Sequence, residues 1–328
     1  MKKIYILILI SVFVTISCET SNTPLAVDSE GKLFITSNID SAEIIIDEQF
    51  TGKYTPDTIS AMATGYNIKL RKEKYFSEEE RVIFKGGELL TLHLELRENN
   101  LERNILLEIF SNVGCNECVI VDSTLNLALN NFSNTRSLII NYPSKFPEIS
   151  DPFYSENPID FDNRLNFYDP ILSNSAYLNG KNLFLPTEIN SIKDIINIEL
   201  SKETKFTMTV FDSVDSGPGY VASIFIDVFD TDQISFASLS LIILVIENEL
   251  EYDSPPGSNG KTSFNAIVRT FLTDYSGRSL SNIGKRGRHK FFETKTLNPL
   301  WVLENLEVVA IIQNIVTKEI LQVGSTYR

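Results

Sequence analysis

The chain has 328 residues, of which 29 are basic and 43 are acidic, giving a formal net charge of −14. This excess of acid argues against nucleic acid as a partner, because phosphate contacts need a basic face, and against broad adhesion to anionic lipid headgroups. The length predicts two or three domains, and a hydrophobic content of 43% is ample for packed cores.

The first 18 residues have the pattern of a lipoprotein signal peptide. Lys2 and Lys3 precede an apolar run over residues 4–14, and a Thr-Ile-Ser-Cys sequence then ends at Cys18. A basic start, a short apolar run and small residues before a cut mark a secretory signal. Lipoprotein signal peptidase cuts directly before such a cysteine, so we expect a lipid on Cys18. The alternative is an ordinary secretory signal with a chance cysteine.

A diacyl anchor on Cys18 would hold the protein stably on a membrane, since two acyl chains bind far more strongly than one. The next residue is Glu19 rather than the aspartate that retains lipoproteins at the inner membrane, which favours the outer membrane. Polar residues 19–30 are predicted to be a tether. Which face of the outer membrane carries the folded part is left open.

Residues 31–98 are predicted to form a small β domain. Strands are expected at residues 33–35, 43–46, 67–71 and 89–96. In the last of these, leucines alternate with polar residues, which is the period-two signature of a half-buried strand.

This unit resembles the PEGA domain, a small β module of surface and envelope proteins. The resemblance implies a binding or spacing role rather than catalysis. The matching residues are Gly31, Leu33, Ile35, Ser37, the segment 42–47, Gly52, Thr55, Pro56, Gly65 and Tyr75.

The pattern changes at Arg103. A buried strand is predicted over residues 105–110, a helix starts at Cys115, and a second buried strand follows over residues 138–142. This order and spacing predict a parallel βαβ unit. An Asn-Gly pair at residues 179–180 predicts a hairpin, and a closing helix is expected over residues 188–200.

The remaining chain, residues 201–328, has the character of strands separated by polar turns. About seven strands in this arrangement predict an antiparallel β-sandwich. They are expected at residues 205–211, 220–229, 239–247, 264–272, 289–294, 306–313 and 319–323.

The segment 106–118, with its Cys-x-x-Cys sequence, looks like the start of a thioredoxin-like fold. From Arg103 to the C-terminus, the chain resembles the outer-membrane-protein-28-related family of envelope lipoproteins. That resemblance implies a thioredoxin-like half over residues 103–200 and a β-sandwich half over residues 201–328. Its motifs are the Asn-Gly pair, residues 264–269, Gly277, Trp301 and residues 317–322.

Cys115 and Cys118 are the only cysteines besides Cys18, and an oxidising compartment favours a disulfide between them. A thiolate at a helix N-terminus has a lowered pKa and attacks disulfides. Cys115 is therefore a candidate nucleophile for thiol–disulfide exchange, with Cys118 as the resolving thiol.

Three features disfavour redox chemistry. Gly114 stands where active thioredoxins usually carry Trp, and Glu117 stands where they usually carry Pro. The position of their cis-proline aligns with Asn174, where a cis bond would cost about 3 kcal/mol. A structural disulfide that fixes the helix to its loop is therefore the favoured interpretation, and redox activity is the alternative.

A basic cluster interrupts the acidic C-terminal half. It suggests a site for an anionic glycan, peptidoglycan or a lipid headgroup, whereas a solvated hairpin is the simpler interpretation. Its members are Lys285, Arg286, Arg288, His289 and Lys290.

An aromatic-rich segment over residues 142–170 suggests a lid or a partner-binding surface, although packing within its own domain is favoured. Asp227, Asp230 and Asp232 suggest calcium, but acids in a turn are the simpler interpretation. The two histidines, His93 and His289, are far apart in sequence, so no metal site and no cofactor are expected.

The sequence thus predicts a multidomain protein of α+β and all-β parts: a PEGA-like domain, a thioredoxin-like domain and a β-sandwich. The favoured function is a lipid-anchored envelope protein at the outer membrane with a binding or structural role toward an envelope protein or glycan. The alternative is a periplasmic thiol–disulfide oxidoreductase that uses Cys115 and Cys118.

Overall fold

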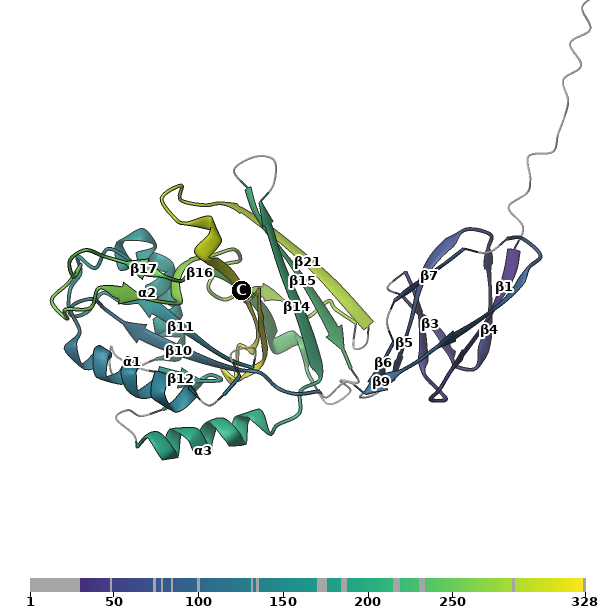
Figure 1. Cartoon of the computed structure of the whole chain (residues 1–328), viewed down its shortest axis with the longest axis horizontal. Helices are drawn as coiled ribbons and strands as arrows, with labels where there is room; N and C mark the ends of the chain where they lie inside the picture. The colour runs from purple at the N-terminus through teal and green to yellow at the C-terminus, as the bar shows by residue number, and fades with distance from the viewer. Residues whose placement is uncertain are drawn as a thin grey trace, which may run out of the picture.

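The computed structural model describes residues 30–326. The exceptions are residues 48, 73–74, 78, 84, 99–100, 131, 134–135, 170–175, 184–187, 215–218, 230–233 and 285–286. The predicted signal peptide, Cys18 and the predicted tether up to residue 29 therefore lie outside the described residues. Within the described part, no helix has both the length and the apolar character needed to cross a membrane. Figure 1 shows a small N-terminal β unit joined to a larger body.

The N-terminal unit consists of two facing sheets with strand orders β4-β1-β8 and β3-β2-β5-β6-β9, with β7 paired to β5. Leu33, Ile35, Ile44, Ile68 and Leu92 belong to the core between the sheets. The four predicted strands are confirmed. The strands are β1 (Glu30–Ser37), β2 (Glu43–Ile46), β3 (Gln49–Tyr54), β4 (Asp57–Met62), β5 (Gly65–Lys72), β6 (Tyr75–Phe76), β7 (Glu80–Ile83), β8 (Leu89–Leu94) and β9 (Arg97–Glu98).

One nine-stranded sheet runs through the larger body in the order β13-β12-β10-β11-β19-β16-β22-β23, with β20 paired to β16. Its parallel pair of β10 and β11 confirms the predicted βαβ unit. The strands are β10 (Ile105–Ser111), β11 (Ser137–Pro143), β12 (Ala176–Leu178), β13 (Lys181–Asn182), β16 (Leu239–Glu247), β19 (Ile267–Phe271), β20 (Arg278–Ser279), β22 (Leu306–Asn314) and β23 (Ile320–Ser325).

This sheet continues across the predicted boundary at residue 200. Strand β11 meets β19 in parallel through the pair Asn141 and Ile267, so strands from both predicted halves share one sheet. The segment expected to be one strand over residues 264–272 is divided by Ala266, whose φ of 54° is unfavourable in a strand. Before the break, β18 (Ser263–Phe264) pairs with β17 (Leu250–Glu251) in a separate hairpin.

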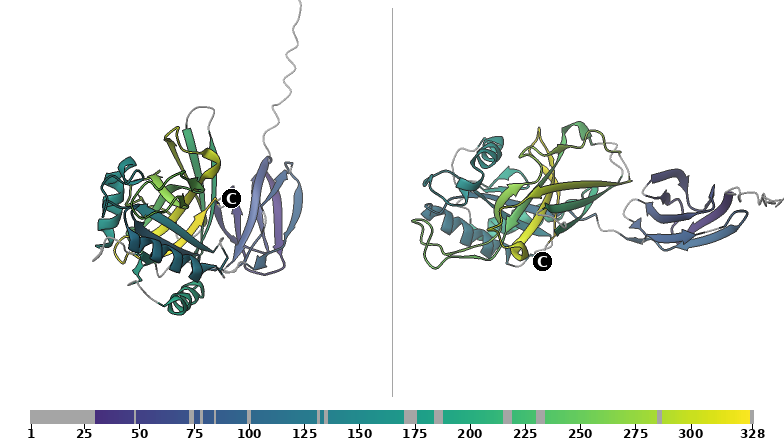
Figure 2. Two further views of the ribbon diagram at one scale, coloured as in Figure 1. Left: turned by 60° about the vertical axis from the view of Figure 1, so that its left-hand side comes forward. Right: turned by 90° about the horizontal axis from the view of Figure 1, so that it is seen from above.

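The large sheet is covered on both faces, and the views in Figures 1 and 2 show these layers. On one face, α1 (Asn116–Leu129) and α3 (Ile189–Leu200) cover the β10–β12 part. On the same face, a second sheet of β14 (Phe206–Val214), β15 (Gly219–Val228) and β21 (Gly287–Thr296) packs on β16 and β22. The predicted sandwich packing is thereby confirmed.

The opposite face is covered by α2 (Pro158–Tyr168) and the short helix η1 (Tyr154–Glu156). Because β16 is covered from both sides, all nine of its residues are buried, which explains its continuous apolar sequence. The further short helices are η2 (Phe236–Ser238) and η3 (Leu303–Asn305).

Helix α2 lies within the aromatic-rich segment 142–170, for which no helix was predicted. Polar residues interrupt its apolar pattern, and its buried face includes a charged residue, Arg164, beside Phe161 and Tyr168. The aromatic side chains mainly pack within the body, as favoured from the sequence, although Phe146 is 57% exposed. In α3, Ile192, Ile196 and Glu199 form the buried face, whereas Ile195 is exposed.

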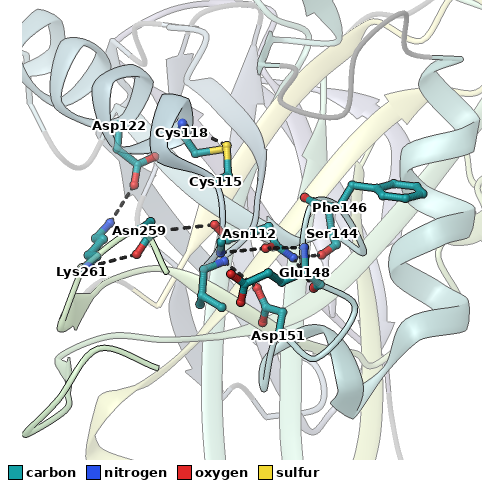
Figure 3. The surroundings of a disulfide bond; sticks show 12 residues. Asn112, Cys115, Cys118, Asp122, Ser144, Phe146, Glu148, Asp151, Asn259 and Lys261 are labelled. Atoms are coloured by element: carbon teal, nitrogen blue, oxygen red, sulfur yellow. Dashed lines mark hydrogen bonds and ion pairs between the residues drawn. A yellow bond between two sulfur atoms is a disulfide. The ribbon is translucent and has the colours of Figure 1, made fainter. Parts of the chain in front are cut away.

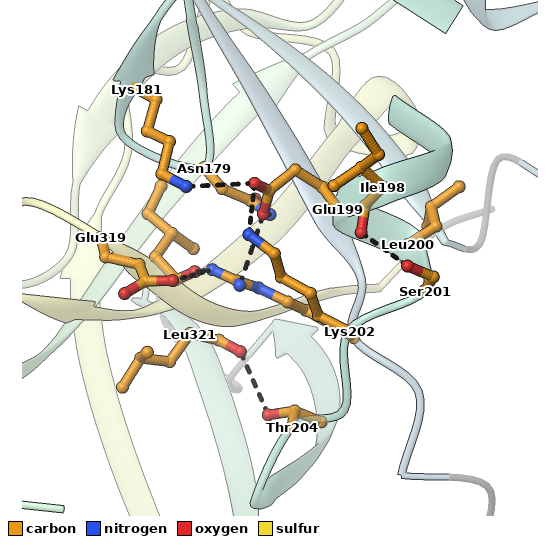
Figure 4. A network of polar contacts seen from close by, with 12 residues as sticks. Asn179, Lys181, Ile198, Glu199, Leu200, Ser201, Lys202, Thr204, Glu319 and Leu321 are labelled. Carbon is orange, nitrogen blue, oxygen red and sulfur yellow. Dashed lines mark hydrogen bonds and ion pairs between the residues drawn. The ribbon is translucent and has the colours of Figure 1, made fainter. Parts of the chain in front are cut away.

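A buried ionic network joins the two halves of the body (Figure 4). Arg103 is paired with Glu199 of α3 at 3.4 Å and with Glu319, next to β23, at 3.1 Å. Glu199 also accepts hydrogen bonds from Lys202 at 2.6 Å and Lys181 at 3.3 Å. Burial alone would raise the pKa of the Glu199 carboxyl, but the hydrogen bond from Lys202 and the charge of Arg103 hold that pKa below its ordinary value.

Candidate functional site

Cys115 and Cys118 form a disulfide at the start of α1 (Figure 3). Cys115 is the N-cap residue, and its sulfur accepts a hydrogen bond from the backbone N–H of Cys118 at 3.1 Å. Cys118 is 4% exposed, whereas Cys115 is partly exposed. Cys115, the more exposed of the two cysteines, therefore lies at the positive end of the helix dipole.

The backbone before the disulfide is held by Asn112. Its side-chain amide donates to the carbonyl oxygens of Ser144 at 2.6 Å and Glu148 at 2.8 Å. Its side-chain oxygen accepts from the N–H groups of Gly114 at 2.8 Å and Glu148 at 3.2 Å. Asn112 is 4% exposed and fixes the disulfide loop to the segment 144–148.

Asp151 holds the same loop from beneath. Its carboxylate accepts hydrogen bonds from the N–H groups of Val113 at 2.9 Å, Phe153 at 2.8 Å and Tyr154 at 3.0 Å. Burial raises the pKa of the Asp151 carboxyl, and the three N–H bonds offset this only in part, so the pKa remains above its ordinary value.

A second loop, residues 257–261, comes from the C-terminal half and lies on the disulfide loop. The backbone N–H of Asn259 donates to the carbonyl of Val113 at 2.9 Å. Ser258 donates to the Glu148 carboxylate, and Lys261 pairs with Asp122 of α1 at 2.7 Å. The loop is thus joined to both the backbone before Cys115 and the helix after it.

The segments that pack around residues 113–114 lie so close together that two positions require glycine. A Cβ atom on Gly257 would lie 2.4 Å from the Val113 side chain and 2.5 Å from the Val113 carbonyl oxygen. A Cβ atom on Gly114 would lie 2.4 Å from the Glu148 side chain. The space beside the disulfide that a large residue at position 114 would occupy is therefore filled by Glu148.

A small cavity lies under Cys118, lined also by Asp122, Asn141 and Lys261. In the described part of the chain, one carboxylate oxygen of Asp122 and the side-chain oxygen of Asn141 are buried without a hydrogen-bond partner. The inner side of the disulfide therefore adjoins two buried polar atoms as well as apolar side chains, among them Phe153, Phe264 and Ile267.

The remaining sequence candidates that the structure describes do not gather at this site. Asp227 is paired with Arg288 at 2.9 Å, and among the described residues no cluster of potential metal ligands is found. His93 contacts Thr36 at 2.9 Å in the N-terminal unit, and His289 contacts the carbonyl of Gly284 at 3.1 Å. Asn174, Asp230, Asp232, Lys285 and Arg286 lie outside the described residues.

The docking of residues 257–261 on the disulfide loop was missed from the sequence. The segment 254–260 reads Ser-Pro-Pro-Gly-Ser-Asn-Gly, which predicts a turn-rich loop. Nothing in the sequence pairs that loop with Val113, because the contact depends on how β11 and β19 meet in the sheet.

Comparison with protein-family models identifies residues 30–100 as a PEGA domain. The resemblance noted in the sequence is thereby confirmed for the N-terminal unit. Among curated proteins, none matches the chain.

The fold is similar to that of a solved structure, HBP35 of Porphyromonas gingivalis, with a TM-score of 0.58 and 15% sequence identity. That match covers 68% of this chain and 74% of the other. A domain of the outer membrane lipoprotein Omp28 from Porphyromonas gingivalis is also matched. It has 13% identity and a TM-score of 0.27 and covers 37% of this chain and 86% of the other, so it says nothing further about the fold.

Proposed function

We propose that this chain is a lipid-anchored protein of the cell envelope, attached through Cys18, with a binding or structural role at the outer membrane. The N-terminal sequence supports export and lipidation. The disulfide between Cys115 and Cys118 suits an oxidising compartment. The PEGA domain follows the proposed tether and would space the larger body from the membrane.

We further propose that residues 103–200 are a thioredoxin-like half and residues 201–328 a β-sandwich half. The order β10, α1, β11, the β12–β13 hairpin and α3 supports the first assignment. Because one sheet contains strands of both, we expect the two halves to unfold as one unit rather than independently.

The observation that carries the non-catalytic role is the enclosure of the disulfide. Thiol–disulfide exchange requires an attacking thiolate to reach a sulfur atom. Residues 144–151 and 257–261 hold the disulfide loop through buried hydrogen bonds, and Cys118 is 4% exposed. Cys115, whose sulfur an attacking thiolate would have to reach, is itself only partly exposed.

Exchange activity is the alternative, and one observation favours it. Cys115 is the partly exposed N-cap of a 14-residue helix, a position that stabilises a thiolate. Glu117 lies in the first turn of the same helix, and its negative charge would oppose that stabilisation.

The two functions are separated by measuring the reduction potential of the pair and its exchange with a small model disulfide. The proposed role predicts a disulfide that is stable in glutathione buffers and exchanges no faster than a Cys115→Ser, Cys118→Ser control. Rapid exchange that is abolished by Cys115→Ser would establish the oxidoreductase instead.

The anchor is tested separately by replacing Cys18. Cys18→Ser should block lipid attachment, remove the globomycin sensitivity of processing and release the protein from the membrane fraction. If the variant stays with the membrane and its mass shows no loss of lipid, the proposed anchor is wrong.

A further inference from the structure

A cavity of about 210 Å³ lies in a gap of the large sheet. Strands β11 and β19 meet only through the pair Asn141 and Ile267, because β19 begins at Ile267. Within the described part of the chain, the earlier residues of β11 therefore have no strand neighbour on that side. The cavity lies there, between β11 and the ends of β16 and β22. One water needs roughly 10–15 Å³, so the cavity has room for a small organic molecule.

The cavity contains a carboxylate. Among the described residues that line it, Glu307 of β22 is the one with an ionisable side chain, and this residue is 7% exposed. The side-chain amide of Asn248 donates to Glu307 Oε2 at 3.3 Å, and the side-chain oxygen of Asn248 accepts from the N–H of Ala266 at 2.9 Å. Because the amide is neutral, it orients the carboxylate but leaves the negative charge in place.

The C-terminal end of helix α1 adds to the negative potential at the same place. Asn126, Leu129 and the C-cap residue Asn130 all line the cavity. This end of a helix is the negative end of the helix dipole and attracts cations, and the last turn of α1 has no basic residue. The whole chain also has a net charge of −14. The potential in the cavity therefore favours a positively charged ligand.

The rest of the lining favours an organic cation over a bare metal ion. Leu129 and Ile246 give the cavity apolar walls, whereas calcium and magnesium require six or more oxygen ligands. The backbone N–H of Asn141 donates to the carbonyl of Ala266 at 2.8 Å. Since backbone groups alternate along a parallel strand, the N–H and C=O of Ile139 face the same side, where Ile139 lines the cavity. These groups suit a hydroxyl on the ligand.

We propose that this cavity binds a small hydroxylated primary amine, such as an amino sugar. The ammonium group donates a charge-assisted hydrogen bond to the Glu307 carboxylate near the C-terminal end of α1. The carbon body packs on Leu129 and Ile246, and a hydroxyl group bonds to the backbone of Ile139. This inference rests on the binding role proposed above and assigns it a site and a ligand class.

The test measures binding to the full chain, purified in detergent, by isothermal titration calorimetry. The probes are glucosamine, glucose, which has the same ring without the ammonium group, and calcium chloride. Glu307→Gln removes the negative charge and keeps the size of the side chain. Asn126→Trp adds bulk at an exposed residue of the cavity lining. Glu304→Gln is the matched control, because it removes the same charge from an exposed residue of η3 that does not line the cavity.

The expected result is binding of glucosamine, with glucose at least tenfold weaker. Glu307→Gln and Asn126→Trp should each weaken glucosamine binding at least tenfold, with the control unchanged. If Glu307→Gln fails to fold, Asn126→Trp alone decides the outcome. Lack of glucosamine binding, equal binding of glucose, or undiminished binding by the folded variants would overturn the proposal. So would calcium that binds in place of glucosamine. Because lipidation at Cys18 is measured separately, this site can fail while the anchored-protein role stands.

Discussion

Replacing Gly257 by alanine should release the loop 257–261 from the disulfide. The new Cβ atom would lie 2.4 Å from the Val113 side chain and 2.5 Å from its carbonyl oxygen, so either the loop or the disulfide segment must move. Overpacking of this kind costs about 1–3 kcal/mol. At 1.4 kcal/mol for each factor of ten, the undocked loop population should rise by about 5-fold to 150-fold.

The assay is reduction of the Cys115–Cys118 disulfide by dithiothreitol under native conditions, followed by alkylation and mass spectrometry. If the docked loop protects the disulfide, the reduction rate should rise by the same factor as the undocked population. Gly87→Ala is the control, because Gly87 is in the PEGA domain, where a new Cβ atom would meet no atom within 4 Å and any strain from its positive φ of 73° is away from the disulfide. An unchanged rate in Gly257→Ala, or an equal rise in the control, would refute the protective role of the loop.

Three further predictions concern buried charges, each measured by urea unfolding. Arg164→Met leaves the fully buried Glu108 without its ion pair at 2.6 Å and should lower the free energy of unfolding by about 3–5 kcal/mol. Replacing both residues by apolar ones should lower it far less. Glu199→Gln should lower the free energy of unfolding by about 1–3 kcal/mol at neutral pH. Because the folded pKa of Glu199 is lowered, this difference in stability should be fully present above its ordinary pKa of 4.5. The difference should disappear as the pH falls through the folded pKa. Asp151→Asn should show the opposite pH dependence, because the folded pKa of Asp151 is raised. The stability of the native chain relative to this variant should be greatest at low pH. It should decline as the pH rises from the ordinary pKa of 3.8 through the folded pKa. A pH-independent difference for either carboxylate would contradict these assignments.

The elements that the sequence predicted well are those whose pattern is local. The strand expected over residues 239–247 coincides with β16, because an apolar run buried on both faces has no other stable arrangement. The hairpin at residues 179–180 was recognisable because both residues adopt positive φ, 46° and 83°, which Asn and Gly tolerate. Cys115 as the helix N-cap followed from the same kind of local signal.

The elements that the sequence did not reveal depend on distant partners. Helix α2 was not predicted, because its buried face contains Arg164, whose charge is matched by Glu108 of β10 and hydrogen-bonded to Gln313 of β22. The continuous sheet rests on the contact between Asn141 and Ile267, for which no sequence pattern exists. The enclosure of the disulfide follows from that junction, so it too could not be foreseen.

The most direct test of the central claim is the intact mass of the protein extracted from membranes of cells that express the full chain. The account predicts a mature chain that begins at Cys18 and carries the added mass of a diacylglyceryl group, with Cys115 and Cys118 oxidised. A chain that begins at another residue, or that begins at Cys18 without added lipid, would contradict it.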